Sequence, residues 1–132
     1  MQLILLIESD PGDRSRLENW LEAAGYSLME CPGPQRQDFT CLGVRGEHCA
    51  LVEIADLAIL DGRVLLDADD HRAARQLLHS YLTSNKPVLL LADGSGAEFS
   101  FEDDRVAVAT RANRESVLQA VRELLDVDRL VA

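Results

Sequence analysis

The stretch that decides the fold is residues 3–25, which read LILLIESDPGDRSRLENWLEAAG. Its first five residues are apolar without alternation, which is typical of a parallel strand covered on both faces. Asp10 can then cap a helix N-terminus, Pro11 suits the first helical position, and Gly25 suits the C-terminal cap. We therefore predict a buried strand over Leu3–Ile7, followed by a helix that begins at Pro11 and stops at Gly25.

Four further apolar segments outside this stretch predict four more strands. They are Ser27–Cys31, Leu57–Leu60, Val88–Ala92 and Val106–Ala109. Amphipathic helices are expected over about 69–83 and from Asn113 onward. Residues 31–48 favour a loop, so any helix between the second and third strands is short and lies near 47–55. Between the fourth and fifth strands we expect a truncated helix or none. This alternation predicts one α/β domain over residues 1–132, built on a doubly wound five-stranded parallel sheet.

Composition narrows the classes of partner. The 132 residues carry 13 Lys and Arg against 23 Asp and Glu, a net charge of −10, which disfavours nucleic acid and anionic membrane surfaces as direct partners. The longest apolar runs, Leu3–Ile7 and Val88–Ala92, are far shorter than the roughly 20 residues that span a bilayer. No signal-peptide pattern is present, so we expect a cytoplasmic protein. Lys86 is the only lysine.

Polar residues follow the predicted strands. Glu8 and Asp10 follow the first strand, Asp61 the third, and Thr110-Arg111 the fifth. Carboxylates from the first and third strands would meet at the switch point of such a sheet, where a cation such as Mg²⁺ relieves their repulsion. The alternative is that Asp10 only caps its helix while the other acids are solvated at strand ends.

Several segments together resemble the receiver domain of bacterial response regulators. The opening ILLIESDPGDRSRLENWLEAAGYSLMEC is similar to the first strand, first helix and second strand of receivers. ADLAILDGR, KPVLLLADGS and VAVATRANRESVLQAVRELL resemble the third, fourth and fifth strands with their flanks. The resemblance covers nearly the whole chain apart from about residues 32–53, and it implies a flavodoxin-like three-layer fold.

The resemblance also implies site residues. Asp61 takes the position of the phosphoacceptor. A Mg²⁺ ion would be held by Glu8, by Asp61 and by the carbonyl of Arg63. In such a receiver, Asp61 would take a phosphoryl group from a phosphohistidine of a partner kinase while the metal neutralises the developing charge.

Three departures from the receiver pattern weaken this site. The usual second acid after the first strand is Ser9, and the usual Thr or Ser after the fourth strand is Ala92. The phosphoryl-sensing lysine aligns with Thr110-Arg111, and an arginine is not an interchangeable substitute for a compact ammonium. Lys86 precedes the fourth strand, which is the wrong edge of the sheet. The switch positions Ala92 and Thr110 are therefore degenerate.

Two hypotheses about function remain open. The first is a stand-alone signalling receiver of a two-component or phosphorelay system, with Asp61 as its phosphoacceptor. The second is a phosphorylation-independent pseudo-receiver that acts as an interaction domain. Either would bind a histidine kinase or another signalling protein, with a homodimer as a further option. The phosphate-binding and nucleophile motifs of common enzymes are missing, so we do not expect an enzyme.

An atypical loop at about 31–50 collects all three cysteines, Cys31, Cys41 and Cys49, together with His48. The spacing lacks the tight Cys-x₂₋₄-Cys pairs of structural zinc loops. A redox- or metal-responsive loop is therefore a third, weaker hypothesis, and small hydrophobic packing residues are the main expectation for these cysteines.

The cysteine loop gives a first testable prediction. We expect all three thiols to titrate as free in the native-purified protein, and we expect no bound zinc by elemental analysis, because neither the spacing nor a cytosolic redox state favours cross-linking. Bound zinc in stoichiometric amount, or fewer than three free thiols, would contradict this expectation.

Overall fold

The computed structural model describes residues 2–8, 10–31, 54–61, 79, 81–83, 85–92 and 105–131. The predicted helix near 47–55, most of the one over 69–83, and the segment 93–104 lie outside these residues. So do Cys41, Cys49 and most of the loop around them. No helix in the described part of the chain is both long and apolar enough to cross a membrane.

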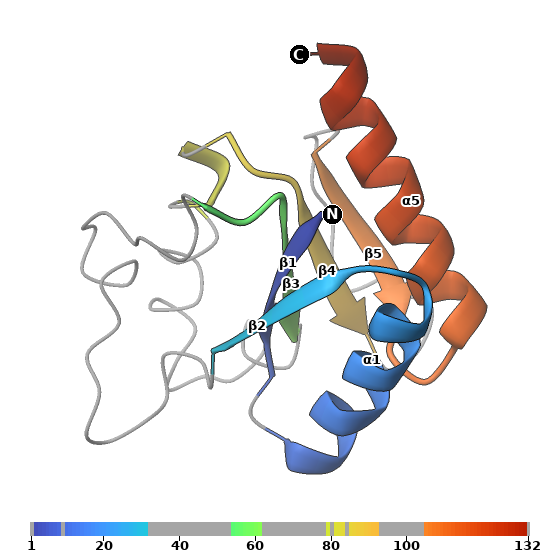
Figure 1. The fold of residues 1–132 in the computed structure, drawn as a ribbon. Helices are drawn as coiled ribbons and strands as arrows, with labels where there is room; N and C mark the ends of the chain where they lie inside the picture. The colour runs from blue at the N-terminus through green and yellow to red at the C-terminus, as the bar shows by residue number, and fades with distance from the viewer. Residues whose placement is uncertain are drawn as a thin grey trace, which may run out of the picture.

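Five strands form one parallel sheet in the order β2-β1-β3-β4-β5, as Figure 1 shows. They are β1 (Leu3–Ile7), β2 (Ser27–Cys31), β3 (Leu57–Asp61), β4 (Val88–Ala92) and β5 (Val106–Thr110). Because the chain first winds outward from β1 to β2 and then back across β1 to β3, the sheet has the predicted doubly wound topology.

Two strand ends differ from the prediction by one residue. The strand β3 continues to Asp61, which is in register with Leu91, and β5 continues to Thr110, which is in register with Ala92. The sequence pattern placed both residues just after their strands because the apolar run stops before them. The ladder extends past the apolar run, so both residues are held by the sheet instead of by a loop.

Helix α1 (Pro11–Ala23) begins and ends as predicted. The Asp10 carboxylate accepts a hydrogen bond from the Asp13 backbone N–H at 2.8 Å, and Pro11 occupies the first turn. At the other end, Gly25 has φ +96°, and its N–H donates to the Glu22 carbonyl at 3.0 Å. The next N–H, of Tyr26, donates to the Leu21 carbonyl, which completes a Schellman cap.

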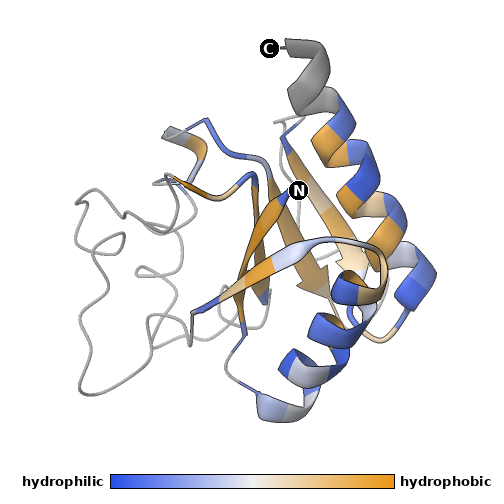
Figure 2. Cartoon of the chain, viewed as in Figure 1, coloured by the Kyte–Doolittle hydropathy of each residue, from blue (hydrophilic) through white to orange (hydrophobic). Residues whose placement is uncertain are grey.

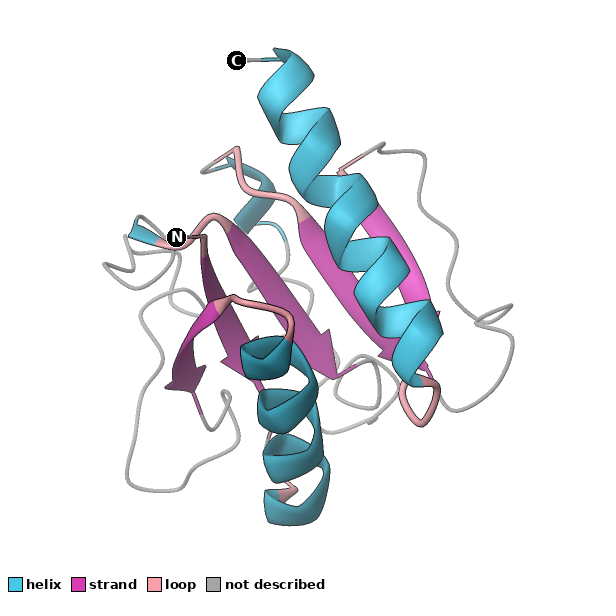
Figure 3. Cartoon of the chain, turned by 45° about the vertical axis from the view of Figure 1, so that its right-hand side comes forward, coloured by secondary structure: helices cyan, strands magenta, loops and turns pink. Residues whose placement is uncertain are grey.

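Helices α1 and α5 (Arg114–Val131) cover the same face of the sheet, as Figure 3 shows. Leu17 and Leu21 of α1 meet Val117 and Val121 of α5 over alternate residues of β1, β3 and β4. Figure 2 shows the corresponding pattern, with apolar strands and polar outer helix faces. The apolar stripe of α1 is narrower than predicted, because Trp20 is only partly buried and Ala24 is exposed.

The opposite face of the sheet carries a second apolar cluster. Leu5, Leu60 and Leu90 contribute to it from the strands, and the buried Tyr81 packs there from a helical turn at 81–83. Each central strand therefore sends alternate side chains into two cores, which explains the apolar runs without alternation.

A substitution at Gly25 tests the helix stop. Gly25→Ala should lower the free energy of unfolding by about 1–2 kcal/mol, because an L side chain is strained at positive φ. A Cβ at Gly25 would meet nothing within 4 Å, so the loss is conformational and not steric. Urea denaturation measures it.

Gly12→Ala is the matched control, since Gly12 lies in the first turn of the same helix. There a Cβ would come no closer than 3.4 Å to the Asp10 carboxylate, so stability should stay the same or rise slightly. Equal effects of the two substitutions would show that the cap at Gly25 does not form.

Candidate functional site

The register of the sheet brings two carboxylates together at the carboxyl ends of β1 and β3. Ile7 is in register with Leu60, so Glu8 and Asp61 come one step later on neighbouring strands, which lie about 4.8 Å apart. Glu8 is 1% exposed and Asp61 is 2% exposed. The interpretation of these two acids as solvated strand-end residues is therefore wrong, whereas the predicted capping role of Asp10 is confirmed.

Strand alternation decides which basic residue can reach Asp61. Along β3, Leu57 and Ile59 point into the core beneath α1 and α5, and Asp61 is the next residue of that series. Along β5, Ala107 and Ala109 face the same core, and Arg111 continues the series just past the strand. Asp61 and Arg111 therefore belong to the same face of the sheet.

The Arg111 guanidinium forms a buried ion pair with Asp61. Its Nη2 donates to Asp61 Oδ1, and the same nitrogen donates to the Leu91 carbonyl at 3.2 Å. The backbone holds Arg111 in place, because its N–H donates to the Ala92 carbonyl at 2.8 Å. Arg111 is only 3% exposed, so solvent does little to screen this pair. One side chain thus connects the ends of β3 and β4 to the segment that enters α5.

Glu8 is held by the start of α1. Its Oε1 accepts a hydrogen bond from the Asp10 backbone N–H at 3.0 Å, and Arg14 Nη1 donates to the Glu8 carbonyl at 3.4 Å. The amino end of a helix also carries a partial positive charge that favours a nearby carboxylate. The Asp61 carboxylate is therefore opposed by Arg111 and the Glu8 carboxylate by a helix terminus, while Arg14 holds the Glu8 backbone.

Arg111 opposes the binding of a divalent cation in this arrangement. The guanidinium already contacts Asp61 where a metal ion would need a carboxylate oxygen, and its positive charge would repel that ion. Two other positions that receivers use for the metal, Ser9 and the expected ligand Arg63, lie outside the described residues. Among the residues described, no group of three or more His, Cys, Asp or Glu side chains is placed to hold a metal ion.

The other positions singled out in the sequence lie as follows. Ala92 is buried at the end of β4 beside Thr110, and its methyl group has no hydrogen bond to offer. The Thr110 backbone N–H donates to Ser116 Oγ at 3.2 Å, which ties the end of β5 to α5. Lys86 immediately precedes Pro87 and β4, at the amino edge of the sheet, as predicted.

A second carboxylate pair lies between α1 and β2. A side-chain hydrogen bond with Glu30 raises the pKa of Glu18, burial and the Glu30 charge act in the same direction, and the Arg14 charge opposes them. A carboxyl whose pKa is raised on folding binds its proton more tightly in the native state. This pair therefore favours folding more as the pH falls toward that raised pKa.

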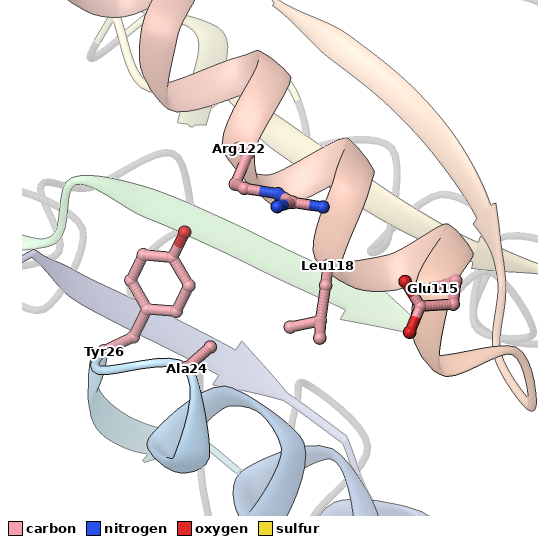
Figure 4. Close-up of a pocket in the computed structure, with 5 residues that line it drawn as sticks. All are labelled: Ala24, Tyr26, Glu115, Leu118 and Arg122. Carbon is pink, nitrogen blue, oxygen red and sulfur yellow. The ribbon is translucent and has the colours of Figure 1, made fainter.

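A pocket of about 210 Å³ lies on the α1 and α5 side of the molecule. Figure 4 shows Ala24 and Tyr26, from the end of α1 and the turn after it, facing Glu115, Leu118 and Arg122 of α5. None of these residues belongs to the strand-end site. The pocket is therefore separate from the acids and from Arg111.

The ion pair predicts a specific pattern of stability. Arg111→Met should lower the free energy of unfolding by about 3–5 kcal/mol, because it leaves the buried Asp61 carboxylate without its counter-charge. The double variant Arg111→Met/Asp61→Leu should recover most of that loss, since it removes both charges. Urea denaturation of the two single variants and the double variant gives the coupling energy.

Arg16→Met is the matched control, because Arg16 pairs with Asp13 at 2.7 Å on the surface of α1. The Arg16 side chain is 40% exposed, so solvent screens this pair, and it should contribute at most about 1 kcal/mol. If Arg111→Met costs no more than Arg16→Met, the buried pair does not form in solution.

Comparison with known proteins supports the fold. No protein-family model matches the chain, and no curated protein matches it in sequence. A response regulator receiver domain protein (CheY-like) from Methanospirillum hungatei is similar in structure, with a TM-score of 0.67 at 18% identity, over 100% of this chain and 99% of that one. A putative pilus assembly protein from Burkholderia thailandensis matches with a TM-score of 0.65 at 19% identity, over 96% and 99% of the two chains.

A third similar structure has a metal ion in its site. It is the receiver domain of a sensor histidine kinase from Pseudomonas aeruginosa, which has a magnesium ion coordinated in its active-site cleft. The TM-score is 0.62 at 18% identity, over 95% of this chain and 98% of that one. Together, the sheet order, the flanking helices and these similarities show that the chain has the fold of response regulator receiver domains.

Proposed function

We propose that this chain is a receiver-fold signalling module that binds a partner protein without being phosphorylated. The observation that carries the proposal is the buried ion pair between Asp61 and Arg111. Asp61 stands where the resemblance to receivers puts the phosphoacceptor. In this chain that carboxylate is already held by a guanidinium.

The ion pair opposes phosphotransfer in two ways. A carboxylate that attacks a phosphoryl group needs a free oxygen and a divalent cation beside it, whereas Arg111 engages Oδ1 of Asp61 and brings a second positive charge to the place of that cation. Separating a buried pair costs about 3–5 kcal/mol, so an Asp61 side chain open to attack would be rarer by a factor of about a hundred or more.

The switch positions support the same proposal. At the ends of β4 and β5, where the resemblance to receivers puts a hydroxyl and an ammonium, this chain has the Ala92 methyl group and Thr110. The Ala92 methyl group cannot donate a hydrogen bond to a phosphoryl group, and Thr110 carries no positive charge that could pair with one and favour a second conformation. Even a phosphorylated form would therefore gain few interactions that favour a shift of the surfaces around β4 and β5.

The competing function is phosphotransfer to Asp61 from a histidine kinase, with Mg²⁺ held by Glu8, Asp61 and the Arg63 carbonyl. It requires Arg111 to leave Asp61 when the metal arrives. The similarity to a receiver domain that holds magnesium keeps this function open to test.

The expected partner is a histidine kinase or another signalling protein, or a second copy of this chain. Receiver domains of a histidine kinase and of response regulators are among the similar structures, as is a pilus assembly protein. We expect no nucleic-acid partner, since the chain carries a net charge of −10.

A phosphodonor assay separates the two functions. The protein is incubated with acetyl phosphate and excess Mg²⁺ and analysed by intact mass, with a receiver that has a complete acidic pair as the positive control. We expect no added phosphoryl group on the wild-type chain. A mass increase of one phosphoryl group that disappears in Asp61→Asn would overturn the proposal in favour of phosphotransfer.

A further inference from the structure

We propose that Arg111 is a tethered substitute for a divalent cation, and that removing its guanidinium turns Glu8 and Asp61 into a divalent-cation site. This inference deepens the proposed function, because it names what keeps the site closed. It concerns three side chains that the structure brings together, all at most 3% exposed.

The first argument is charge. Glu8 and Asp61 follow register-paired residues of adjacent strands, so their negative charges are forced close together in a region that water hardly reaches. Like charges in such a place are strongly unfavourable unless a cation lies between or beside them. The backbone fixes the two acids, so a cation of some kind is required wherever both are ionised.

The second argument is the set of atoms around the guanidinium. Arg111 Nη2 contacts a carboxylate oxygen of Asp61 and the backbone carbonyl oxygen of Leu91, which lies 3.2 Å away. Carboxylate and carbonyl oxygens are also the ligands that Mg²⁺ and Mn²⁺ select. The guanidinium therefore uses oxygen atoms that a hard metal ion would also use, and the two cations compete for them.

The third argument explains why the guanidinium prevails in the wild-type chain. Arg111 is attached to the chain and positioned by the hydrogen bond between its backbone N–H and the Ala92 carbonyl. It therefore binds Asp61 without the entropic cost of capturing an ion from solution. A guanidinium is also weakly hydrated, whereas Mg²⁺ gives up its water reluctantly.

The inference predicts a gain of metal binding on removing a positive residue. Arg111→Gln keeps much of the side-chain length but removes the charge, and Mn²⁺ binding is measured by electron paramagnetic resonance of the free ion. We expect one Mn²⁺ per chain in Arg111→Gln, bound about a hundredfold more tightly than in the wild type, in line with the strength of a buried charge pair.

Three further variants make the experiment specific. Arg114→Gln makes the same charge change at an exposed arginine three residues away and should leave Mn²⁺ affinity at the wild-type value. Arg111→Gln/Asp61→Asn should lose the new site. Arg111→Lys keeps a tethered cation and should bind Mn²⁺ more weakly than Arg111→Gln does.

Folding is followed in parallel by circular dichroism, because Arg111→Gln leaves two acids unbalanced. If that variant is unfolded without metal, Mn²⁺ should refold it, whereas Arg111→Gln/Asp61→Asn should show no metal-dependent refolding. If Arg111→Gln is folded and binds no Mn²⁺, or is unfolded and is not refolded by Mn²⁺, the inference is overturned.

The Mn²⁺ binding experiment and the phosphodonor assay can fail independently of each other. Equal Mn²⁺ affinity in the wild type and Arg111→Gln would overturn the tethered-cation inference. The phosphodonor assay would still decide whether Asp61 is phosphorylated. A wild-type chain that is not phosphorylated, combined with an Arg111→Gln chain that binds no Mn²⁺, would retain the proposed function and remove only the inference.

Discussion

The buried ion pair between Asp61 and Arg111 is the interaction on which the carboxyl edge of the sheet depends. Parallel pairing of β1 with β3 places Glu8 and Asp61 next to each other and away from water. Without a counter-charge, this geometry would oppose the packing of α1 and α5 over the same strands. Arg111 supplies the charge and also bonds the Leu91 carbonyl, so it secures β3, β4 and the entry to α5 together.

Because of the same ion pair, the receiver fold of this chain does not by itself imply phosphotransfer. A similar receiver domain carries magnesium in its cleft, yet it shares only 18% of its residues with this chain over 95% of the length. A shared fold does not determine what the residues at its functional edge do. Here the edge holds two buried acids and a buried arginine, which favours a carboxylate paired within the chain over a site that waits for a metal ion and a phosphoryl group.

Much of the fold was predictable because it depends on local signals. The apolar run Leu3–Ile7, the cap at Asp10 and the stop at Gly25 each follow from the conformational preferences of the residues themselves, and the structure confirms all three. The one-residue extensions of β3 and β5 were missed because polar residues at strand ends resemble loop residues. Only the hydrogen-bonded ladder with β4 shows that they belong to the sheet.

The candidate site was less accessible to sequence analysis. The meeting of Glu8 with Asp61 could be expected from strand order, but their burial could not, because it depends on the helices that cover them. The sequence pattern puts Arg111 after the fifth strand but does not by itself pair it with Asp61. A signal was nevertheless present, since Asp61 and Arg111 each continue the alternate series of residues that faces α1 and α5. Strand alternation, used together with the positions of the strand ends, predicts that Asp61 and Arg111 lie on the same face of the sheet.

A crystal structure of the wild-type chain grown in saturating Mg²⁺ tests the central claim most directly. Our account predicts density for the Arg111 guanidinium on the Asp61 carboxylate and no ion between Asp61 and Glu8, even with the metal in large excess. An octahedral Mg²⁺ bound to Asp61, with Arg111 turned away from it, would contradict the account.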